Sequence, residues 1–196
     1  MTRRSGSRAP RWSRPPGSIG LNGLRVCPDG EDIYFGVSGT LATGGTEGVI
    51  YRLPRVEQPT EADLEEVHSY PAGEAPDGIA FGENGKLYVA LAGSNQISIL
   101  NRHGVETQRL SGPTGSTVPF DAPANVAFDG EGSLLVTNHA IFTANPGHMA
   151  VLSVFVDDDG LELESGPVQG NGNSNTHGHD HGHDHGHSHG RGHHHD

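Results

Sequence analysis

The chain has little of what a disulfide, a nucleic-acid interface or a membrane span requires. Cys27 is the single cysteine among 196 residues, which excludes an internal disulfide. Lys86 is the single lysine and the formal net charge is −12, so no nucleic-acid partner is expected, because phosphate binding needs a basic surface. No apolar run approaches about 18 residues, which predicts no membrane span. Since no apolar segment follows the first arginines, there is no secretory signal pattern, and we expect a cytoplasmic protein.

Glycine and proline are abundant by contrast, with 30 and 13 copies. This composition favours short strands joined by tight turns. Residues 1–18 hold five arginines without an apolar segment, and we predict a disordered leader there. A basic arm that touches an acidic partner is the alternative.

One pattern occurs three times, at residues 21–35, 76–89 and 123–136. Each copy places two short apolar strands on either side of a turn that contains Asp-Gly or Asn-Gly, which is a strong signal for a β-hairpin. Asn22, Asp77 and Ala124 occupy equivalent positions, so the copies are 55 and 47 residues apart.

Further strand candidates follow each copy, at 48–53, 96–100 and 149–156. About four strands in each unit of this length are typical of a propeller blade. We therefore predict an all-β fold, a partial β-propeller of about three four-stranded blades over residues 19–169. A β-sandwich with coincidental spacing is the alternative. No segment strongly predicts a helix, and residues 61–67 are interpreted as a loop or strand that leads to the next blade.

Several of these segments resemble a known family. They are 22–30 (Asn-Gly-Leu-Arg-Val-Cys-Pro-Asp-Gly), 75–81 (Ala-Pro-Asp-Gly-Ile-Ala-Phe), 123–128 (Pro-Ala-Asn-Val-Ala-Phe) and 135–139 (Leu-Val-Thr-Asn-His). The pattern is similar to the senescence-marker-protein/gluconolactonase family of six-bladed propellers, which is related to diisopropyl-fluorophosphatase. The resemblance covers about 145 residues and corresponds to the C-terminal half of that fold.

The resemblance implies a Ca²⁺ ion in the central channel and hydrolysis of a lactone or related ester. Asn22 aligns with a metal-binding Asn of the family, and Asp77 aligns with a metal-binding Asp that is often assigned as general base or nucleophile. The residue types suit this role, because Ca²⁺ prefers carboxylate and amide oxygens and polarises a carbonyl group. The carboxylate could activate water or attack directly. A plain turn role before glycine is the alternative for both residues.

The third copy departs from the first two. Ala124 offers no side-chain oxygen, so Asn125 is the candidate ligand there, with turn capping as its alternative. His139 is a candidate catalytic residue that stabilises a substrate oxygen, as some relatives carry a channel histidine at this place; a structural histidine is the alternative. The resemblance assigns the remaining Glu and Asn ligands to earlier blades. We therefore expect activity impaired by truncation, with a homodimer that closes the propeller as the other outcome.

Residues 170–196 form a separate Gly/His-rich segment, which we predict to be a disordered tail. Its imidazoles suit Zn²⁺ or Ni²⁺. The predicted ligands are His177, His179, His181, His183, His185, His187 and His189. The tail supports a second functional hypothesis, a non-catalytic propeller fragment or binding protein that binds Zn²⁺ or Ni²⁺.

Overall fold

The computed structural model describes residues 19–39 and 46–161, which belong to one compact unit of the chain. They form three antiparallel sheets and two 3-10 turns. The predicted leader, the tail histidines and the end of the predicted propeller region lie outside the described residues. In the part that is described, no helix is long and apolar enough to cross a membrane.

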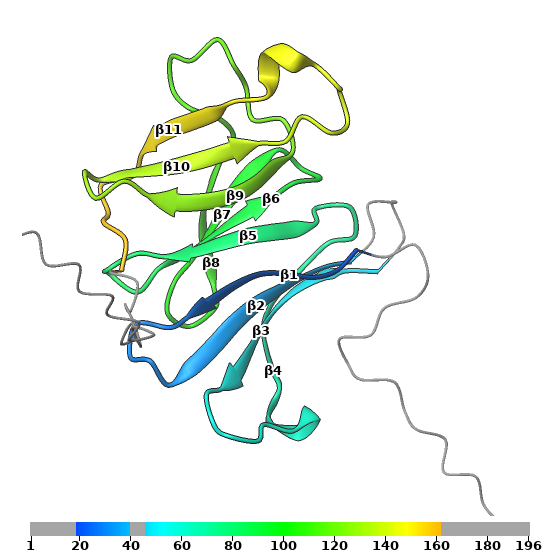
Figure 1. The fold of residues 1–196 in the computed structure, drawn as a ribbon, viewed down its shortest axis with the longest axis vertical. Coiled ribbons are helices and arrows are strands. Elements are labelled where there is room, and N and C mark those ends of the chain that lie inside the picture. The colour runs from blue at the N-terminus through cyan, green and yellow to red at the C-terminus, as the bar shows by residue number, and fades with distance from the viewer. Residues whose placement is uncertain (1–18, 40–45, 162–196) are drawn as a thin grey trace, which may run out of the picture. The chain divides into compact units, whose positions relative to one another are not determined.

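Each sheet is built from strands that are consecutive in sequence (Figure 1). The first contains β1 (Ile19–Val26), β2 (Asp32–Gly39), β3 (Gly48–Pro54) and β4 (Glu65–Tyr70). The second contains β5 (Pro76–Phe81), β6 (Leu87–Leu91), β7 (Gln96–Leu100) and β8 (Glu106–Leu110). The third contains β9 (Pro123–Phe128), β10 (Ser133–Asn138) and β11 (Val151–Phe155).

This architecture confirms the predicted all-β fold of about three blades. The three sequence copies are the hairpins β1–β2, β5–β6 and β9–β10, each with its Gly-containing turn. The third sheet has three strands rather than four within the described ranges. Residues 61–67 form a 3-10 turn at Glu61–Asp63 and then enter β4, so the strand interpretation was correct there.

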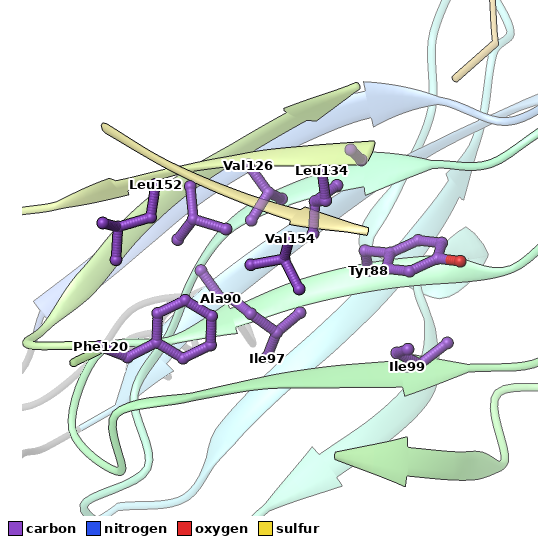
Figure 2. Close-up of a cluster of buried hydrophobic side chains, with 11 residues drawn as sticks. Tyr88, Ala90, Ile97, Ile99, Phe120, Val126, Leu134, Leu152 and Val154 are labelled. Atoms are coloured by element: carbon purple, nitrogen blue, oxygen red, sulfur yellow. The ribbon is translucent and has the colours of Figure 1, made fainter. Parts of the chain in front are cut away.

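The core consists of apolar side chains packed between successive sheets. Alternate residues of a strand point to opposite faces, so each sheet can contact the next through one residue in two. Between the second and third sheets the cluster includes Tyr88, Ile97, Val126, Leu134 and Val154, as Figure 2 shows. A second cluster, which includes Ile50, Tyr70, Ile79, Val89 and Leu91, joins the first sheet to the second.

The first strands of the three sheets lie next to one another, with β5 between β1 and β9. Two glycines allow this approach. A Cβ atom on Gly23 would lie 2.2 Å from the Asp77 carbonyl oxygen, and one on Gly78 would lie 2.7 Å from the Ala124 carbonyl oxygen. Glycine within a strand is typical where another backbone comes this close. The three copies of the sequence motif therefore contact one another directly.

Candidate functional site

The three innermost strands share a backbone irregularity at the motif positions. In β1 the register shifts between Asn22 and Leu24, and in β5 it shifts between Pro76 and Ile79. In β9 Asn125 pairs with Thr137 and Pro123 with Asn138, so Ala124 is the extra residue. Bulges of this kind redirect side chains and are common beside active sites. Each of the three innermost strands thus has a bulge at the motif position, where the direction of the side chains changes.

Asn22 is oriented by a short hydrogen-bond chain. The Ser38 hydroxyl donates to the Pro76 carbonyl oxygen at 2.7 Å, so its oxygen is left to accept from Asn22 Nδ2 at 3.3 Å. This assigns the amide orientation and leaves Asn22 Oδ1 with one hydrogen bond from the described part of the chain, donated by the Gly23 N–H at 3.3 Å. The chain ends on Pro76, the residue that precedes Asp77. The side chain of Asn22 is thereby linked to the strand that carries Asp77.

Asp77 has a half-buried carboxylate, and no residue of the described ranges donates a hydrogen bond to it. Burial raises the pKa of Asp77 from 3.8 to about 6, and the nearby His139 opposes this rise. Removal from water without compensating donors disfavours the charged form of a carboxyl group. A carboxyl group with a strongly shifted pKa beside a backbone bulge is a candidate functional residue.

His139 follows the last residue of β10 and is exposed. Its backbone N–H donates to the Ala122 carbonyl oxygen at 3.0 Å, which holds it against the residue before β9. Its effect on the pKa of Asp77 shows that the two side chains are within electrostatic range. Asp77 and His139 are the two residues predicted to be catalytic. The catalytic role itself remains a prediction.

Asn125 lies against the neighbouring sheet. Its Oδ1 accepts from the Val126 N–H at 3.0 Å, and a Cβ atom on Gly78 would lie 2.3 Å from the same oxygen. The side chain thus covers Gly78 while it caps its own strand. The hydrogen bond from Val126 is local, as expected for the capping role that is the alternative to metal binding. The role of Asn125 as a metal ligand stays a prediction.

The loops at the start of β5 and β9 form one end of the described unit. Pro76 pairs with Leu91 and Pro123 pairs with Asn138, so loops 71–75, 92–95, 111–122 and 139–150 meet there (Figure 1). We call this end the site face. It carries Asn22 and Asp77, which are near the starts of their strands, and His139. The turns 82–86 and 101–105 lie at the opposite end.

Backbone strain is concentrated on the site face. Five non-glycine residues there have φ between 48° and 57°. They are Ala75, Asn95, Ala122, Ala140 and Ala144. An L-residue in this region costs on the order of 1 kcal/mol or more, and such residues cluster at functional sites. Asn95 Oδ1 accepts from the Ala122 N–H at 2.7 Å, so part of the strain is held by contacts between loops of two sheets.

A polar cluster on the same face was not predicted from the sequence. Asp121 accepts hydrogen bonds from Thr143 and from the ring of His148, and Asn138 braces the surrounding backbone. Asp121, Thr143 and His148 are separated by up to 27 residues and lie in loops without a repeat pattern. No spacing rule therefore indicated the cluster, since only the tertiary structure brings it together.

The described residues fit part of a calcium site. Asn22 Oδ1 and the Asp77 carboxylate are hard oxygen donors on adjoining strands, and no residue in 19–39 or 46–161 donates a competing hydrogen bond to the carboxylate. Calcium takes about six to eight oxygen ligands, so two side chains supply only a fraction of them. In the ranges described, no group of three His, Cys, Asp or Glu residues could hold a metal ion.

The sheets and the site face together define a set of consecutive propeller blades with a polar site at the starts of their innermost strands. The chain belongs to the SMP-30/gluconolactonase/LRE-like family, whose model matches residues 12–140. The resemblance inferred from the three motifs is thereby confirmed. No functionally curated protein matches the chain.

Two solved structures show the same fold. A luciferin-regenerating enzyme matches with a TM-score of 0.52 and 17 % identity, over 72 % of this chain and 47 % of its own. Regucalcin from Agrobacterium tumefaciens, described as a calcium-binding protein, matches with a TM-score of 0.51 and 22 % identity, again over 72 % and 47 %. This chain thus spans about half the length of the solved propellers that it matches.

Proposed function

We propose that the described blades carry part of a calcium-dependent site that hydrolyses a lactone or a related ester. The observation that carries the proposal is the Asp77 carboxylate, half-buried, without a hydrogen-bond donor in the described ranges and next to the strand of Asn22. A cation would relieve this unfavourable burial, because a positive charge within a few ångströms favours the ionised carboxylate.

Each residue of the proposed site has a distinct task. Asn22 Oδ1 and the Asp77 carboxylate would hold the ion, which when bound polarises the carbonyl group of a lactone. The network through Ser38 keeps the Asn22 oxygen available. His139, on the exposed side next to Asp77, would donate a hydrogen bond to a substrate oxygen. Membership of the family and the calcium-binding regucalcin among the matched structures support this assignment.

The test is hydrolysis of a simple lactone by the full chain with Ca²⁺ and with EGTA. We expect hydrolysis in the presence of Ca²⁺ and none in EGTA. We also expect the Asp77→Ala variant to lose about 100-fold or more of the rate, as when other groups that act on the reacting centre are removed. Glu83→Ala is the matched control, because Glu83 is an exposed acid in the turn at the opposite end of the same sheet. Equal rates for the Asp77 variant and the unchanged chain would remove the catalytic proposal.

A further inference from the structure

A salt-bridge network that reaches the loop before β5 is the strongest feature that the proposed function leaves unused. Arg109, on β8, lies between two glutamates. Its Nη2 is 2.8 Å from Glu74 Oε2, and its Nε is 2.8 Å from Glu106 Oε1. Nη1 of Arg109 also donates to Glu74 Oε1 at 2.9 Å. The guanidinium group thus contacts both carboxylate oxygens of Glu74, which fixes the direction of that side chain as well as its distance.

The contact between Arg109 and Glu74 is partly withdrawn from water. The side chains of Glu74 and Arg109 are 19 % and 27 % exposed. Arg109 Cζ lies 5.9 Å from the ring centroid of Tyr70, the buried residue that ends β4. Salt screens a partly buried ion pair less than one at the surface. Arg109 can therefore hold the loop 71–75, which carries Glu74, against the second sheet.

Glu74 precedes a strained turn that leads directly to the proposed calcium ligand. Ala75 is buried and has φ 51°, a strained conformation for an L-residue. β5 then begins, and its second residue is Asp77. The Glu74 carbonyl oxygen accepts from the Gly93 N–H at 3.0 Å, and the next carbonyl oxygen accepts from the Ala92 N–H at 3.0 Å. Strained residues persist only where the surroundings fix them. The anchored side chain of Glu74 is one such constraint.

An equivalent arrangement leads into β9. Residues 121–123 repeat the order of an acidic residue, alanine and proline, and Ala122 has φ 48°. The Ala122 carbonyl oxygen accepts from the His139 N–H at 3.0 Å, in the same way as the corresponding oxygen before β5. The Asp121 carboxylate is 2.8 Å from His148 Nδ1. An acidic side chain paired with a basic residue therefore precedes the strained alanine at equivalent places in two sheets.

We propose that Arg109 is a positioning residue for Asp77, an inference that rests on the proposed function. Arg109 fixes Glu74, this side chain fixes the strained turn, and the turn sets where Asp77 enters β5 and meets the calcium ion. Ser38 holds the same segment from the first sheet by donating to the Pro76 carbonyl oxygen at 2.7 Å. Removal of a group that holds a metal ligand in place typically lowers metal affinity or activity by about 10–100-fold.

Amide hydrogen exchange tests the anchor in the full chain without reference to catalysis. The Ala92 and Gly93 amides report on the turn, because they donate to its carbonyl oxygens. We expect Glu74→Ala and Arg109→Met to speed the exchange of both amides by about 10-fold or more, while amides in the middle of β6 keep their rates. Glu106→Ala is the matched control, since it removes the other carboxylate on Arg109, 26 % exposed, and leaves the loop contact in place.

Calcium dependence tests the link to Asp77. Glu74→Ala and Arg109→Met should each raise the Ca²⁺ concentration for half-maximal lactone hydrolysis by about 10-fold, with KM for the lactone unchanged. Calorimetric titration with Ca²⁺ should show the same weakening. Arg109→Lys should recover part of the loss, because an ammonium group still pairs with Glu74. The double variant should be no worse than either single variant, since both act through one contact.

Unchanged exchange at the two amides in both variants overturns the inference and leaves the proposed function intact. Faster exchange with an unchanged response to Ca²⁺ also overturns it, because the turn would then not position Asp77. An equal loss in Glu106→Ala does the same, since general weakening of the sheet would be the cause. An unchanged chain that lacks calcium-dependent hydrolysis overturns the proposed function, and this inference with it. If Glu74→Ala fails to fold, Glu74→Gln decides in the same way, because it removes the charge and keeps the size.

Discussion

Burial without a hydrogen-bond donor sets the behaviour of Asp77. Most buried carboxylates in proteins are paired with a cation or accept hydrogen bonds. Asp77 has neither among the described residues, and its pKa is raised to about 6. In the absence of a cation, the ionised side chain therefore opposes folding. Residues selected for chemistry often reduce stability in this manner.

Asp77→Asn should accordingly stabilise the calcium-free protein at alkaline pH. A folded pKa of about 6 against 3.8 means that the folded chain binds the proton more tightly than the unfolded chain. The contribution of Asp77 to stability thus falls as pH rises from about 4 to about 6 and is level above that. We expect the variant to gain on the order of 1–2 kcal/mol at pH 8 and little at pH 4. The full shift in the pKa of Asp77 would correspond to a larger gain in stability, but solvent reduces the gain because the side chain is only half-buried.

Urea unfolding in EGTA at the two pH values measures this difference. Glu83→Gln is the control, as it removes a charge from an exposed turn. If Asp77→Asn raised the free energy of unfolding equally at pH 4 and pH 8, burial of the ionised carboxylate would not be the cause.

At the scale of the strands, the approach of β5 to β9 depends on the missing side chain of Gly78. A Cβ atom there would lie 2.3 Å from Asn125 Oδ1 and 2.5 Å from Asn125 Cα. Because a backbone atom is among these neighbours, rotation of a side chain cannot relieve the contact. The same glycine position recurs in β1 as Gly23, so the close approach is a repeated property of the fold.

Gly78→Ala should therefore destabilise the protein by about 1–3 kcal/mol through overpacking between sheets. Gly20→Ala is the matched control, because Gly20 lies in β1 and a Cβ atom there would meet nothing within 4 Å. That variant should be neutral or slightly stabilising, since alanine restricts the unfolded chain. Thermal unfolding of both variants provides the measurement. Equal melting temperatures would show that the inner strands can separate without cost.

The strands also show which features the sequence could predict. The hairpins around Asp29-Gly30 and Asn84-Gly85 were predictable because turn residues and alternating apolar positions act locally. The contact between Asn22 and the strand of Asp77 required the repeat, which places equivalent residues at equivalent points of neighbouring blades. The Asp121–His148 pair was not predictable, because it joins two irregular loops through long-range packing. The strained backbone at Ala75 likewise has no signal in residue type.

At the scale of the whole molecule, we expect Ni²⁺ or Zn²⁺ to bind to the predicted tail. The described ranges contain no group of three His, Cys, Asp or Glu residues suited to a metal ion. Binding of Ni²⁺ or Zn²⁺ by the full chain should therefore reside in the histidines after residue 170. A chain that ends at Gly170 should lose this binding in a calorimetric titration and keep its response to Ca²⁺. Retained Ni²⁺ binding would place the Ni²⁺ site elsewhere in the chain.

Within the described residues, the third sheet carries exposed apolar side chains on one face. Leu152 and Val154 are buried against the second sheet, while Val151 and Phe155 on the same strand are 65 % and 72 % exposed. On β1, Leu21 is also exposed. Exposed apolar surface of this kind favours association. We propose that a second copy of the chain covers these exposed apolar side chains.

The packing between the blades argues that such an association is looser than the contacts within one copy. Asn125 stands where β1 and β5 have Gly23 and Gly78, so β9 lacks the glycine that allows the close approach of the next strand in the other two sheets. We therefore expect a weak, concentration-dependent dimer that sedimentation at increasing protein concentration would detect.

Val151→Glu should shift the dimer to the monomer by placing a charge on the open face. Val105→Glu, at an exposed valine of the β7–β8 turn, should have no effect. Asn125→Gly should tighten the dimer. A chain that stays monomeric, or that dimerises equally in the Val151 variant, would exclude this face as the contact.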